Sequence, residues 1–309
     1  MEYTLITGGC GSIGQNLIRK LSSSGRKILV LDNLTSGRRE WLPIDVEFIV
    51  GDIRDHETLE RVFGNYKINE VVHLAANFAN QNSVENPSLD SEVNINGSIL
   101  LLKFIVKHGI KNVVYTSSSC VYGNKSDKTN ELYIGELDTP YAISKYTAEF
   151  YFKYFAETYN LSCKVLRLFN SYGPYELSGA YRNVIPNFIS RALEGLPITI
   201  TGSGNETRDF TFVEDTIEAI QKALEFNDTT YDVFNVGKGE PVKIIDLANK
   251  ILKICESNST ITFEPRRSWD HVLHRECDNS KIKNTLNWQA KTSIDQGLKK
   301  YISWYLINQ

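Results

Sequence analysis

The chain has 309 residues, 41% of them hydrophobic, with 34 Lys and Arg against 37 Asp and Glu and a net charge of −3. This length and composition are ordinary for a globular protein and predict a core that is stable without disulfides or a structural metal. The balanced charge, with no long run of one sign, argues against nucleic acid polymers and membrane surfaces as partners.

The five cysteines are scattered and include no Cys-x-x-Cys pair. They predict neither a disulfide framework nor a zinc site, and they favour a reducing, cytoplasmic compartment. The chain begins with an apolar strand-like run rather than a basic signal segment, and the apolar stretch Ile99–Val106 is too short to cross a bilayer. We expect a cytoplasmic protein with no bound metal, export signal or membrane span.

Short strand-like runs alternate with amphipathic stretches through the first half of the chain. The predicted strands are Tyr3–Ile6, Lys27–Leu31, Glu47–Val50, Glu70–Leu74, Asn112–Thr116 and Lys164–Leu168, and the helices between them include Gly14–Ser24 and Asp55–Gly64. This alternation predicts an α/β fold with a doubly wound parallel sheet, whose ligands bind at the carboxyl ends of the strands.

After Asn170 the pattern loosens into loops with Gly and Pro, and helical periodicity returns at Glu214–Phe226 and Lys243–Glu256. This half predicts a smaller α/β lobe whose chain crosses back to the sheet near Asp232–Val236, rather than a separate domain on a linker. The segment Ser88–Val106 is apolar nearly all round, so it must be covered on more than one side, by the lobe or by a second subunit.

A glycine-rich loop, Thr7–Gly14, follows the first strand and opens a helix. Glycines there permit a tight turn and let a pyrophosphate approach the helix N-terminus, although the spacing alone is a weak signal. Asp32 ends the second strand, where a carboxylate can bind an adenosine ribose and would repel a 2′-phosphate, which favours NAD over NADP. Asp52 ends the third strand and suits either an adenine amine or, equally, a turn or helix cap.

Two later segments contain side chains that could take part in catalysis. Thr116–Gly123 follows the fifth strand and is rich in hydroxyls, and Pro140–Lys145 opens a long helix. Tyr141 and Lys145 are spaced i, i+4, so both can point at one ligand. Alone they would be an ordinary surface pair, but the glycine loop and the hydroxyl-rich strand end favour an active site.

Taken together, these motifs resemble the extended short-chain dehydrogenase/reductase family, and within it the NAD-dependent nucleotide-sugar epimerases and dehydratases, such as UDP-glucose 4-epimerases. The resemblance covers nearly the whole chain, and further matching segments are His73–Ala76, Arg167–Asn170, Thr207–Phe210 and Phe234–Gly237. It implies a Rossmann-type fold, NAD as cofactor and a nucleotide diphosphate sugar as substrate. The implied division gives residues 1–169, with 211–236 returning to them, to an NAD-binding domain, and 170–210 and 237–309 to a nucleotide-sugar-binding lobe.

The resemblance also implies roles for the catalytic residues. Tyr141 would act as a phenolate base on a sugar hydroxyl, Ser118 would hydrogen-bond that hydroxyl, and Lys145 would hold the nicotinamide ribose. Ionising a free tyrosine at pH 7 costs about 4 kcal/mol. One cation at ~6 Å supplies about 2.8 kcal/mol at an effective dielectric constant of ~20. Lys145 therefore needs the positive nicotinamide beside it, and we expect the base to be active chiefly with oxidised cofactor bound.

Binding residues follow from the same resemblance. The implied NAD-binding set is Gly8, Gly11, Ser12, Ile13, Gly14, Asp32, Asn33, Asp52, Ile53, Leu74, Ala75, Ala76, Asn94 and Thr116, together with Tyr141 and Lys145. The implied substrate set is Asn77, Ser118, Ser119, Cys120, Asn170, Asn183, Val184, Arg208, Arg267 and Asp270. Arg208 is the firmest of these because a pyrophosphate needs a buried cation, and Arg275 is a further candidate for that charge.

Departures from the family patterns narrow the reaction. The 4,6-dehydratases carry Asp-Glu directly after the position of Ser118, whereas this chain has Ser119 and Cys120, so dehydration is disfavoured. Oxidation at the sugar C4 remains, giving a 4-epimerase if the ketone is reduced again or a C4 dehydrogenase if it is released, and the sequence does not separate the two.

Two other functions are weaker alternatives. Cys120 resembles the cysteine of GDP-mannose 3,5-epimerases, but Gly179 falls near the place of their partner lysine. A cysteine at a strand end is also more often a small core residue. A non-catalytic NAD-binding sensor is disfavoured because Ser118, Tyr141 and Lys145 are all present.

Members of the family usually form homodimers by pairing two helices from each subunit into a four-helix bundle. Such pairing would cover the apolar Ser88–Val106 segment and the aromatic run Phe150–Phe155. We therefore expect a homodimer.

Overall fold

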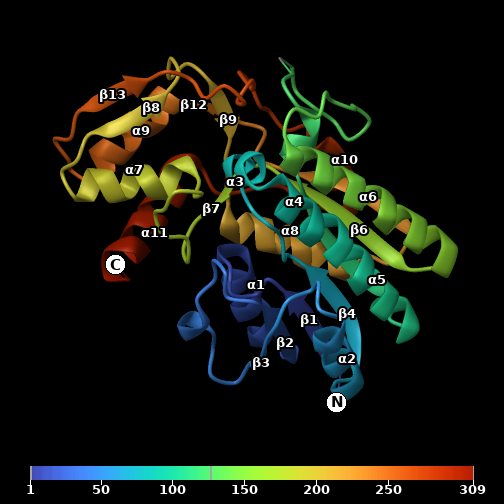
Figure 1. Ribbon diagram of the computed structural model, residues 1–309. Helices are drawn as coiled ribbons and strands as arrows, with labels where there is room; N and C mark the ends of the chain where they lie inside the picture. The colour runs from blue at the N-terminus through green and yellow to red at the C-terminus, as the bar shows by residue number, and fades with distance from the viewer. Residues whose placement is uncertain (1, 126, 309) are drawn as a thin grey trace.

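A seven-stranded parallel sheet forms the centre of the computed structural model, which describes residues 2–125 and 127–308 (Figure 1). The strands are β1 (Tyr3–Thr7), β2 (Ile28–Asp32), β3 (Glu47–Val50), β4 (Ile68–His73), β5 (Asn112–Ser118), β6 (Ser162–Leu168) and β11 (Tyr231–Val236). Their order is β11-β6-β5-β4-β1-β2-β3, with every neighbouring pair parallel. The predicted doubly wound sheet is confirmed, and all its carboxyl ends meet at one edge.

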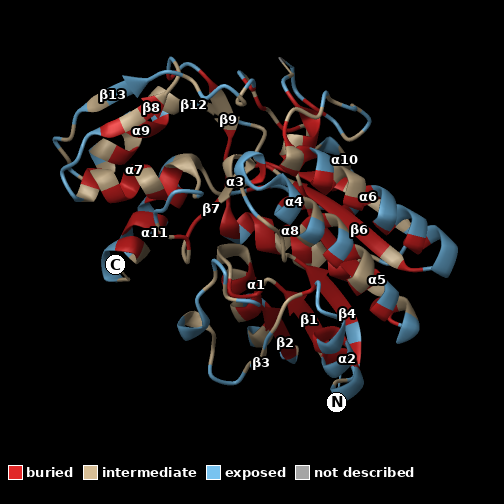
Figure 2. Ribbon diagram, viewed as in Figure 1, coloured by how far each residue is buried: buried red, intermediate tan, exposed pale blue. Residues whose placement is uncertain are grey.

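Successive side chains of the strands pack into two separate hydrophobic cores, one on each face of the sheet. Leu5 and Val71 pack with α2 (His56–Asn65), α5 (Ser98–Lys107) and α6 (Pro140–Tyr159) on one face of the sheet. Ile6 and Val72 pack on the other face with α1 (Ser12–Ser23) and α8 (Val213–Glu225). Because successive residues of a strand point to opposite faces, these apolar runs bury both faces of the central strands. In Figure 2 the middle of the sheet is buried, whereas the edge strand β3 has no buried residue.

Short elements make up the rest of the chain, and most of them form a second lobe at the left of Figure 1, whereas α10 (Ser280–Leu286) lies at the upper right. They are β7 (Ser171–Tyr172), α7 (Val184–Leu193), β8 (Ile198–Thr201), β9 (Thr207–Asp209), β10 (Thr211–Phe212), β12 (Pro241–Lys243), α9 (Ile244–Ile254), β13 (Ile261–Glu264), α10 (Ser280–Leu286) and α11 (Ile294–Ile307). Side chains of the lobe such as Phe188, Leu247 and Tyr301 join the same core as the α1 face of the sheet. The two lobes therefore share one apolar interior, and the predicted domain boundaries stay a prediction.

The apolar segment Ser88–Val106 is interrupted in the structure. It is divided into α4 (Pro87–Ser91), a π-helical turn (Glu92–Gly97) and α5. Leu101 and Ile105 are fully buried in the core that α5 shares with α2 and α6. Helices α2 and α6 thus cover one side of the segment. The sequence had led us to expect that the second lobe or a second subunit would cover it.

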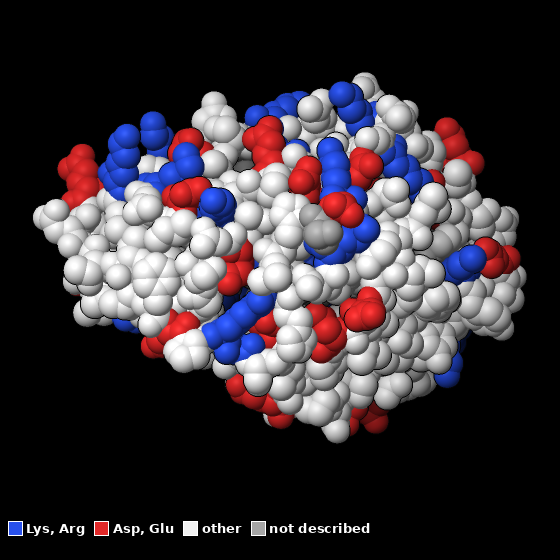
Figure 3. All heavy atoms as spheres, turned by 90° about the horizontal axis from the view of Figure 1, so that it is seen from above, with Lys and Arg blue, Asp and Glu red and all other residues white. Residues whose placement is uncertain are grey.

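Short helical pieces complete the chain: 3₁₀ turns at Arg39–Trp41 and Ser119–Tyr122, and α3 (Asn80–Glu85). Within the described residues, no helix is both long enough and apolar enough to cross a membrane. On the face seen in Figure 3, Lys and Arg lie interspersed with Asp and Glu. This face therefore offers an anionic ligand individually placed cations rather than a continuous basic surface.

Candidate active site

The glycine loop approaches its neighbours too closely for larger residues. Gly8 has φ +71°, and a Cβ there would lie 2.6 Å from the backbone N of Ala75. A Cβ on Gly14 would lie 2.5 Å from the Cα of Gly9. Helix α1 begins directly after Gly11, which has no side chain to cap the first N–H groups. Those N–H groups, at the positive end of the helix dipole, fit a pyrophosphate.

The start of α1 also contacts the loop that leads into the second lobe. Ser12 and Ile13 open α1, and the Ser12 hydroxyl donates to the carbonyl of Pro174 at 3.0 Å. Asn16, one turn further along, donates to the same carbonyl at 3.1 Å. The start of α1 is therefore attached to the loop that leads into the second lobe.

Asp32 lies in front of the glycine loop at the end of β2. Its Oδ2 accepts from the backbone N–H of Cys10 at 2.9 Å, and its Oδ1 from that of Leu34 at 2.8 Å. Burial raises the pKa of this carboxyl, and the two backbone donors oppose that rise. Each oxygen keeps acceptor capacity for a second donor, so the carboxylate fits the predicted contact with a ribose diol.

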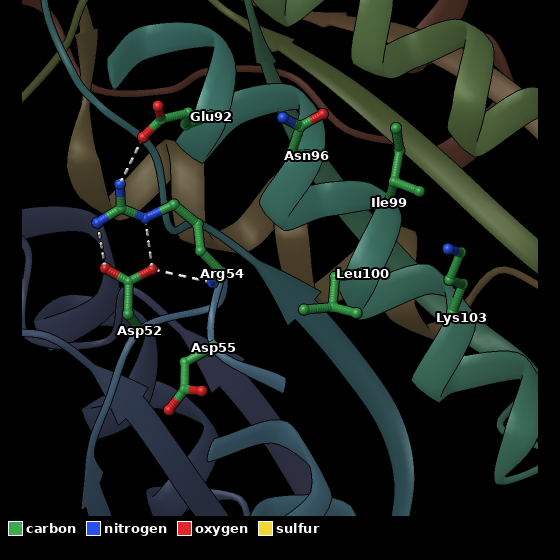
Figure 4. A pocket seen from close by; sticks show the side chains of 8 residues that line it. All are labelled: Asp52, Arg54, Asp55, Glu92, Asn96, Ile99, Leu100 and Lys103. Carbon is green, nitrogen blue, oxygen red and sulfur yellow. Dashed lines mark hydrogen bonds and ion pairs between the residues drawn. The ribbon is translucent and has the colours of Figure 1, made fainter. Parts of the chain in front are cut away.

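Asp52 is held more tightly than its predicted adenine contact requires (Figure 4). Its Oδ1 accepts from the Arg54 backbone N–H at 2.9 Å and the Arg54 Nε at 3.0 Å, and its Oδ2 accepts from Arg54 Nη2 and Asn33 Nδ2, both at 2.9 Å. These bonds, Arg54 foremost, lower the pKa of Asp52 to about 2. A carboxylate has about four acceptor positions. An adenine amine would have to share one, while Ile53 beside it is buried.

The loop after β4 closes over the glycine loop. Its first residue, Leu74, donates its backbone N–H to the Thr7 carbonyl at 3.0 Å, and Ala75 and Ala76 follow, half-buried. Thr116, at the end of β5, is buried and donates its hydroxyl to the carbonyl of His73 at 3.1 Å. These residues therefore line the carboxyl edge of the sheet, with the Thr116 side chain engaged by the protein.

Asn94 ties that loop to the catalytic helix. It is buried in the π-helical turn, a feature often found at functional sites. Its Oδ1 accepts from the Asn77 N–H at 2.8 Å, and its Nδ2 donates to Asp90 and to Ser144, both at 3.0 Å. The side chain thus binds protein groups, and its predicted contact with a cofactor stays a prediction.

Three residues of the predicted catalytic set meet at the carboxyl end of β5. Ser118 ends the strand, and Tyr141 and Lys145 stand one turn apart in α6, which Pro140 and an accepting Thr139 hydroxyl start. Tyr141 is 7% and Lys145 3% exposed. The phenol of Tyr141 is hydrogen-bonded to Ser118. The arrangement places a hydroxyl, a phenol and an ammonium group on one site.

Burial shifts the pKa of both ionisable groups against their charged forms. The pKa of Tyr141 is raised well above its usual value by burial and by the nearby Cys120 and Asp90, while the bond with Ser118 lowers it. Burial also lowers the pKa of Lys145 to about 8, although Asp90 and Glu149 raise it. A phenolate at Tyr141 therefore requires positive charge beyond that of the surrounding side chains, as the sequence led us to expect.

A loop of the first lobe lies over the phenol. The ring of Phe78 meets that of Tyr141 edge-on at 6.3 Å. Asn80 Nδ2 donates to the Cys120 thiol at 3.5 Å, and Asn80 Oδ1 accepts from the Thr139 hydroxyl at 2.9 Å. This loop and Cys120 therefore form the wall beside Tyr141.

Arginines of the second lobe converge on one carboxylate. Arg208 Nη2 lies 3.5 Å and Arg266 Nη2 3.6 Å from Asp270 Oδ1. Arg275 is buried and donates to the carbonyl of Ser119, next to Ser118. Burial lowers the pKa of Arg208, and Arg275 and Arg266 add to that effect. Two guanidinium groups thus share one carboxylate, with that of Arg275 acting on Arg208, and the excess positive charge fits a diphosphate.

Arg267 does not join this cluster. It is exposed, and its guanidinium lies 5.6 Å from the ring centroid of Trp269, a cation–π pair that holds it at the surface. Its neighbour in the chain, Arg266, faces Asp270 instead.

The other predicted substrate residues lie where the lobe meets the sheet. Asn170 Nδ2 donates to the Asp209 carbonyl at 2.8 Å. Asn183 Nδ2 donates to Glu176 Oε1 at 3.1 Å, directly before Val184 opens α7. Burial raises the pKa of Glu176 to about 7. These amides hold the loop that leads from the sheet to the lobe.

Sequence reasoning missed Asp90, a buried carboxylate on α4. The available signal was an acidic residue inside an otherwise apolar segment, four residues before Asn94 and so on the same helical face.

Comparison with known proteins agrees with this geometry. Residues 4–237 match the model of the NAD-dependent epimerase/dehydratase family. A putative UDP-glucose 4-epimerase of Methanocaldococcus jannaschii is 31% identical over 308 residues, 97% of each chain. The solved structure of the epimerase Mth375 from Methanothermobacter thermautotrophicus matches with a TM-score of 0.95 and 38% identity, over 99% of this chain and 92% of that one.

A Thermotoga maritima UDP-glucose 4-epimerase, solved with UDP-glucose, matches with a TM-score of 0.95 and 33% identity over 99% of both chains. The predicted family and the predicted cofactor are confirmed. The chain belongs to the NAD-dependent epimerase/dehydratase family and is an NAD-dependent enzyme.

Proposed function

We propose that the protein is a nucleotide-sugar 4-epimerase that oxidises its substrate transiently at the sugar C4. The observation that carries this proposal is the meeting of Tyr141, Ser118 and Lys145 at the end of β5, beside the arginine cluster of the second lobe. Several similar proteins are named UDP-glucose 4-epimerases, so UDP-hexoses are the first substrates to test.

Some residues of the site transfer a proton, and others position the substrate and the cofactor. Bound NAD would supply the hydride acceptor for C4 and the hydride that reduces the ketone again. Tyr141 removes the proton of the C4 hydroxyl and later gives it back, Ser118 orients that hydroxyl, and Lys145 holds the nicotinamide ribose and adds positive charge near the phenol. The keto-sugar must present its other face before it is reduced again.

The arginine cluster explains how the sugar can turn without leaving. Arg208, Arg266 and Arg275 bind the diphosphate by charge-assisted hydrogen bonds, so the nucleotide stays fixed while the hexose rotates about its link to the phosphate. Ser119 and Cys120 offer a hydroxyl and a thiol after Ser118 rather than the acid pair of a dehydratase.

The test is to incubate the purified enzyme with UDP-glucose and with UDP-galactose and to follow the products by NMR. We expect the same mixture of the two C4 epimers from either side, and no turnover by Tyr141→Phe with NAD binding nearly intact. Accumulation of a free 4-ketone would identify a C4 dehydrogenase instead. No change in any UDP-, GDP-, CDP- or dTDP-sugar would contradict the proposal.

We also propose that two chains pair through α5 and α6. Three large apolar side chains on α6 are exposed: Phe150 by 58%, Tyr154 by 56% and Ile143 by 46%. Several exposed apolar side chains on one helix indicate an interaction surface. Light scattering should give twice the mass of one chain, and Tyr154→Glu should weaken the dimer; a monomer at micromolar concentration would count against it.

A cytoplasmic location and the division into an NAD-binding and a sugar-binding part belong to the same proposal. All five cysteines are free, which suits a reducing compartment. The glycine loop and Tyr141 lie before residue 170, and Arg208, Arg266 and Arg275 lie after it.

A further inference from the structure

One buried carboxylate near the catalytic helix has mainly neutral groups as its hydrogen-bond partners. Asp90 on α4 is 1% exposed. Its Oδ1 accepts from Asn94 Nδ2 at 3.0 Å, and its Oδ2 has no hydrogen-bond partner within residues 2–125 and 127–308. The side chains of Ser144 and Asn77 and the charge of Lys145 also lower the pKa of this carboxyl, but burial is the largest effect and raises it. Neutral donors alone compensate a buried carboxylate poorly, because removing the charge from water is costly. A nearby cation is therefore expected.

Asp90 is linked to the catalytic helix by a short path. The same Nδ2 of Asn94 donates to Ser144 Oγ at 3.0 Å, and Ser144 Oγ donates to the carbonyl of Tyr141 at 3.2 Å. Ser144 immediately precedes Lys145, and α4 packs on α6, as Figure 1 shows. Asp90 thus lies beside the turn of α6 that carries both catalytic groups.

Lys145 is the cation whose charge acts on the Asp90 carboxyl and lowers its pKa. Its Nζ lies 4.5 Å from the ring centroid of Tyr115 on β5. The carboxylates that act on it are Asp90 from α4 and Glu149 from α6, and His73 faces it from β4. His73 is neutral, because burial lowers its pKa to about 3.

Glu149 is already committed to other partners. It pairs with the buried Arg167 at 2.7 Å and accepts from Ser117 at 2.5 Å. Asp90 is therefore the carboxylate left to balance the ammonium group of Lys145.

We propose that Asp90 is a positioning residue whose carboxylate is the buried counter-ion of Lys145 and keeps it charged at the active site. The inference rests on the proposed function only in taking Tyr141 and Lys145 as the catalytic pair. Asp90 acts through these two residues.

Removing the charge of Asp90 should lower the pKa values of both Lys145 and Tyr141. Without the Asp90 charge the pKa of Lys145 falls from about 8. Charges about 6–10 Å apart at an effective dielectric constant of about 20 shift each other's pKa by about 1–2 units. The pKa of Tyr141 falls as well, because Asp90 raises it. Both limbs of the pH profile of kcat/KM should therefore move to lower pH in Asp90→Asn, whereas a purely structural defect would lower its height alone.

The decisive experiment titrates Lys145 directly in the protein without sugar. The Nζ signal of ¹⁵N-lysine-labelled enzyme, assigned by its loss in Lys145→Met, is followed against pH in the wild type and in Asp90→Asn, whose amide can still accept from Asn94. We expect the midpoint to fall by about 1–2 pH units. The control Asp295→Asn, which removes an exposed carboxylate bound to Lys250 on the far lobe, should leave it in place. An unchanged midpoint in folded Asp90→Asn would overturn the proposal.

If Asp90→Asn does not fold, the coupling is measured from the other partner. Electrostatic coupling is reciprocal, so Lys145→Met should raise the pKa of the Asp90 carboxyl, followed by its ¹³C signal. No change there would also refute the pairing. Neither titration depends on turnover, so an intact coupling in an enzyme that alters no nucleotide sugar would refute the proposed function and leave this inference standing.

Discussion

The ion pair beneath the active site gives the sharpest stability prediction. Arg167 on β6 and Glu149 on α6 have side chains 6% and 4% exposed, with Nη2–Oε2 at 2.7 Å and Nε–Oε1 at 3.0 Å. Arg167 also donates to the Tyr122 hydroxyl at 2.9 Å. Glu149→Gln leaves this guanidinium buried without its counter-charge and turns an amide donor toward it. Removing one partner of a buried pair costs about 3–5 kcal/mol.

Denaturant unfolding followed by circular dichroism measures this loss, with Glu60→Gln as a control. Glu60 bonds Lys107 on the open surface, so its change should leave the unfolding free energy nearly unaltered. The double variant Glu149→Leu/Arg167→Met should recover much of the loss, since an apolar pair needs no counter-charge. A cost below about 1 kcal/mol for Glu149→Gln would refute the reasoning that this pair is shielded from solvent.

Three further predictions concern the site. Tyr141→Phe should abolish turnover while calorimetry still detects NAD binding; residual activity near the wild-type level would remove Tyr141 from the mechanism. Arg208→Ala should weaken UDP binding by about 10–100-fold, the worth of a charge-assisted bond, while Arg267→Ala changes it less than about 2-fold, and equal effects would contradict the arginine cluster. Because burial raises the pKa of Glu176 from 4.5 to about 7, the folded state binds more protons than the unfolded state between these values, so stability falls as pH rises through them. Glu176→Gln should lose that pH dependence in unfolding measurements, and an identical profile in both proteins would show that Glu176 ionises normally.

The parallel sheet was readable from the sequence because each strand is a local run of β-branched and apolar residues between turn signals. All six predicted strands occur, with ends within about two residues of those predicted, and Glu47–Val50 has the predicted ends. The predicted return of the chain to the sheet near Asp232–Val236 is β11. The short strands of the lobe were not predicted. β13 and β8 are four residues each and are defined by their pairing, such as Ile261 with Ile198, between positions far apart in the chain.

Some residues of the active site could also be predicted from the sequence, and others could not. Tyr141, Lys145 and the glycine loop were found because their spacing along one helix or turn carries the signal. Asp90 was missed, since only the packing of α4 on α6 brings it to Lys145. The choice between Arg266 and Arg267 also depends on tertiary contacts, because Trp269 holds one of two adjacent arginines at the surface.

The central claim is that the hydrogen removed from C4 returns to the same carbon. Epimerising UDP-glucose in D₂O and examining the UDP-galactose by NMR and mass spectrometry tests it most directly. The account predicts a product with no deuterium on any ring carbon, because Tyr141 exchanges only the hydroxyl proton with solvent. Deuterium on a ring carbon would contradict it and indicate proton abstraction from carbon instead.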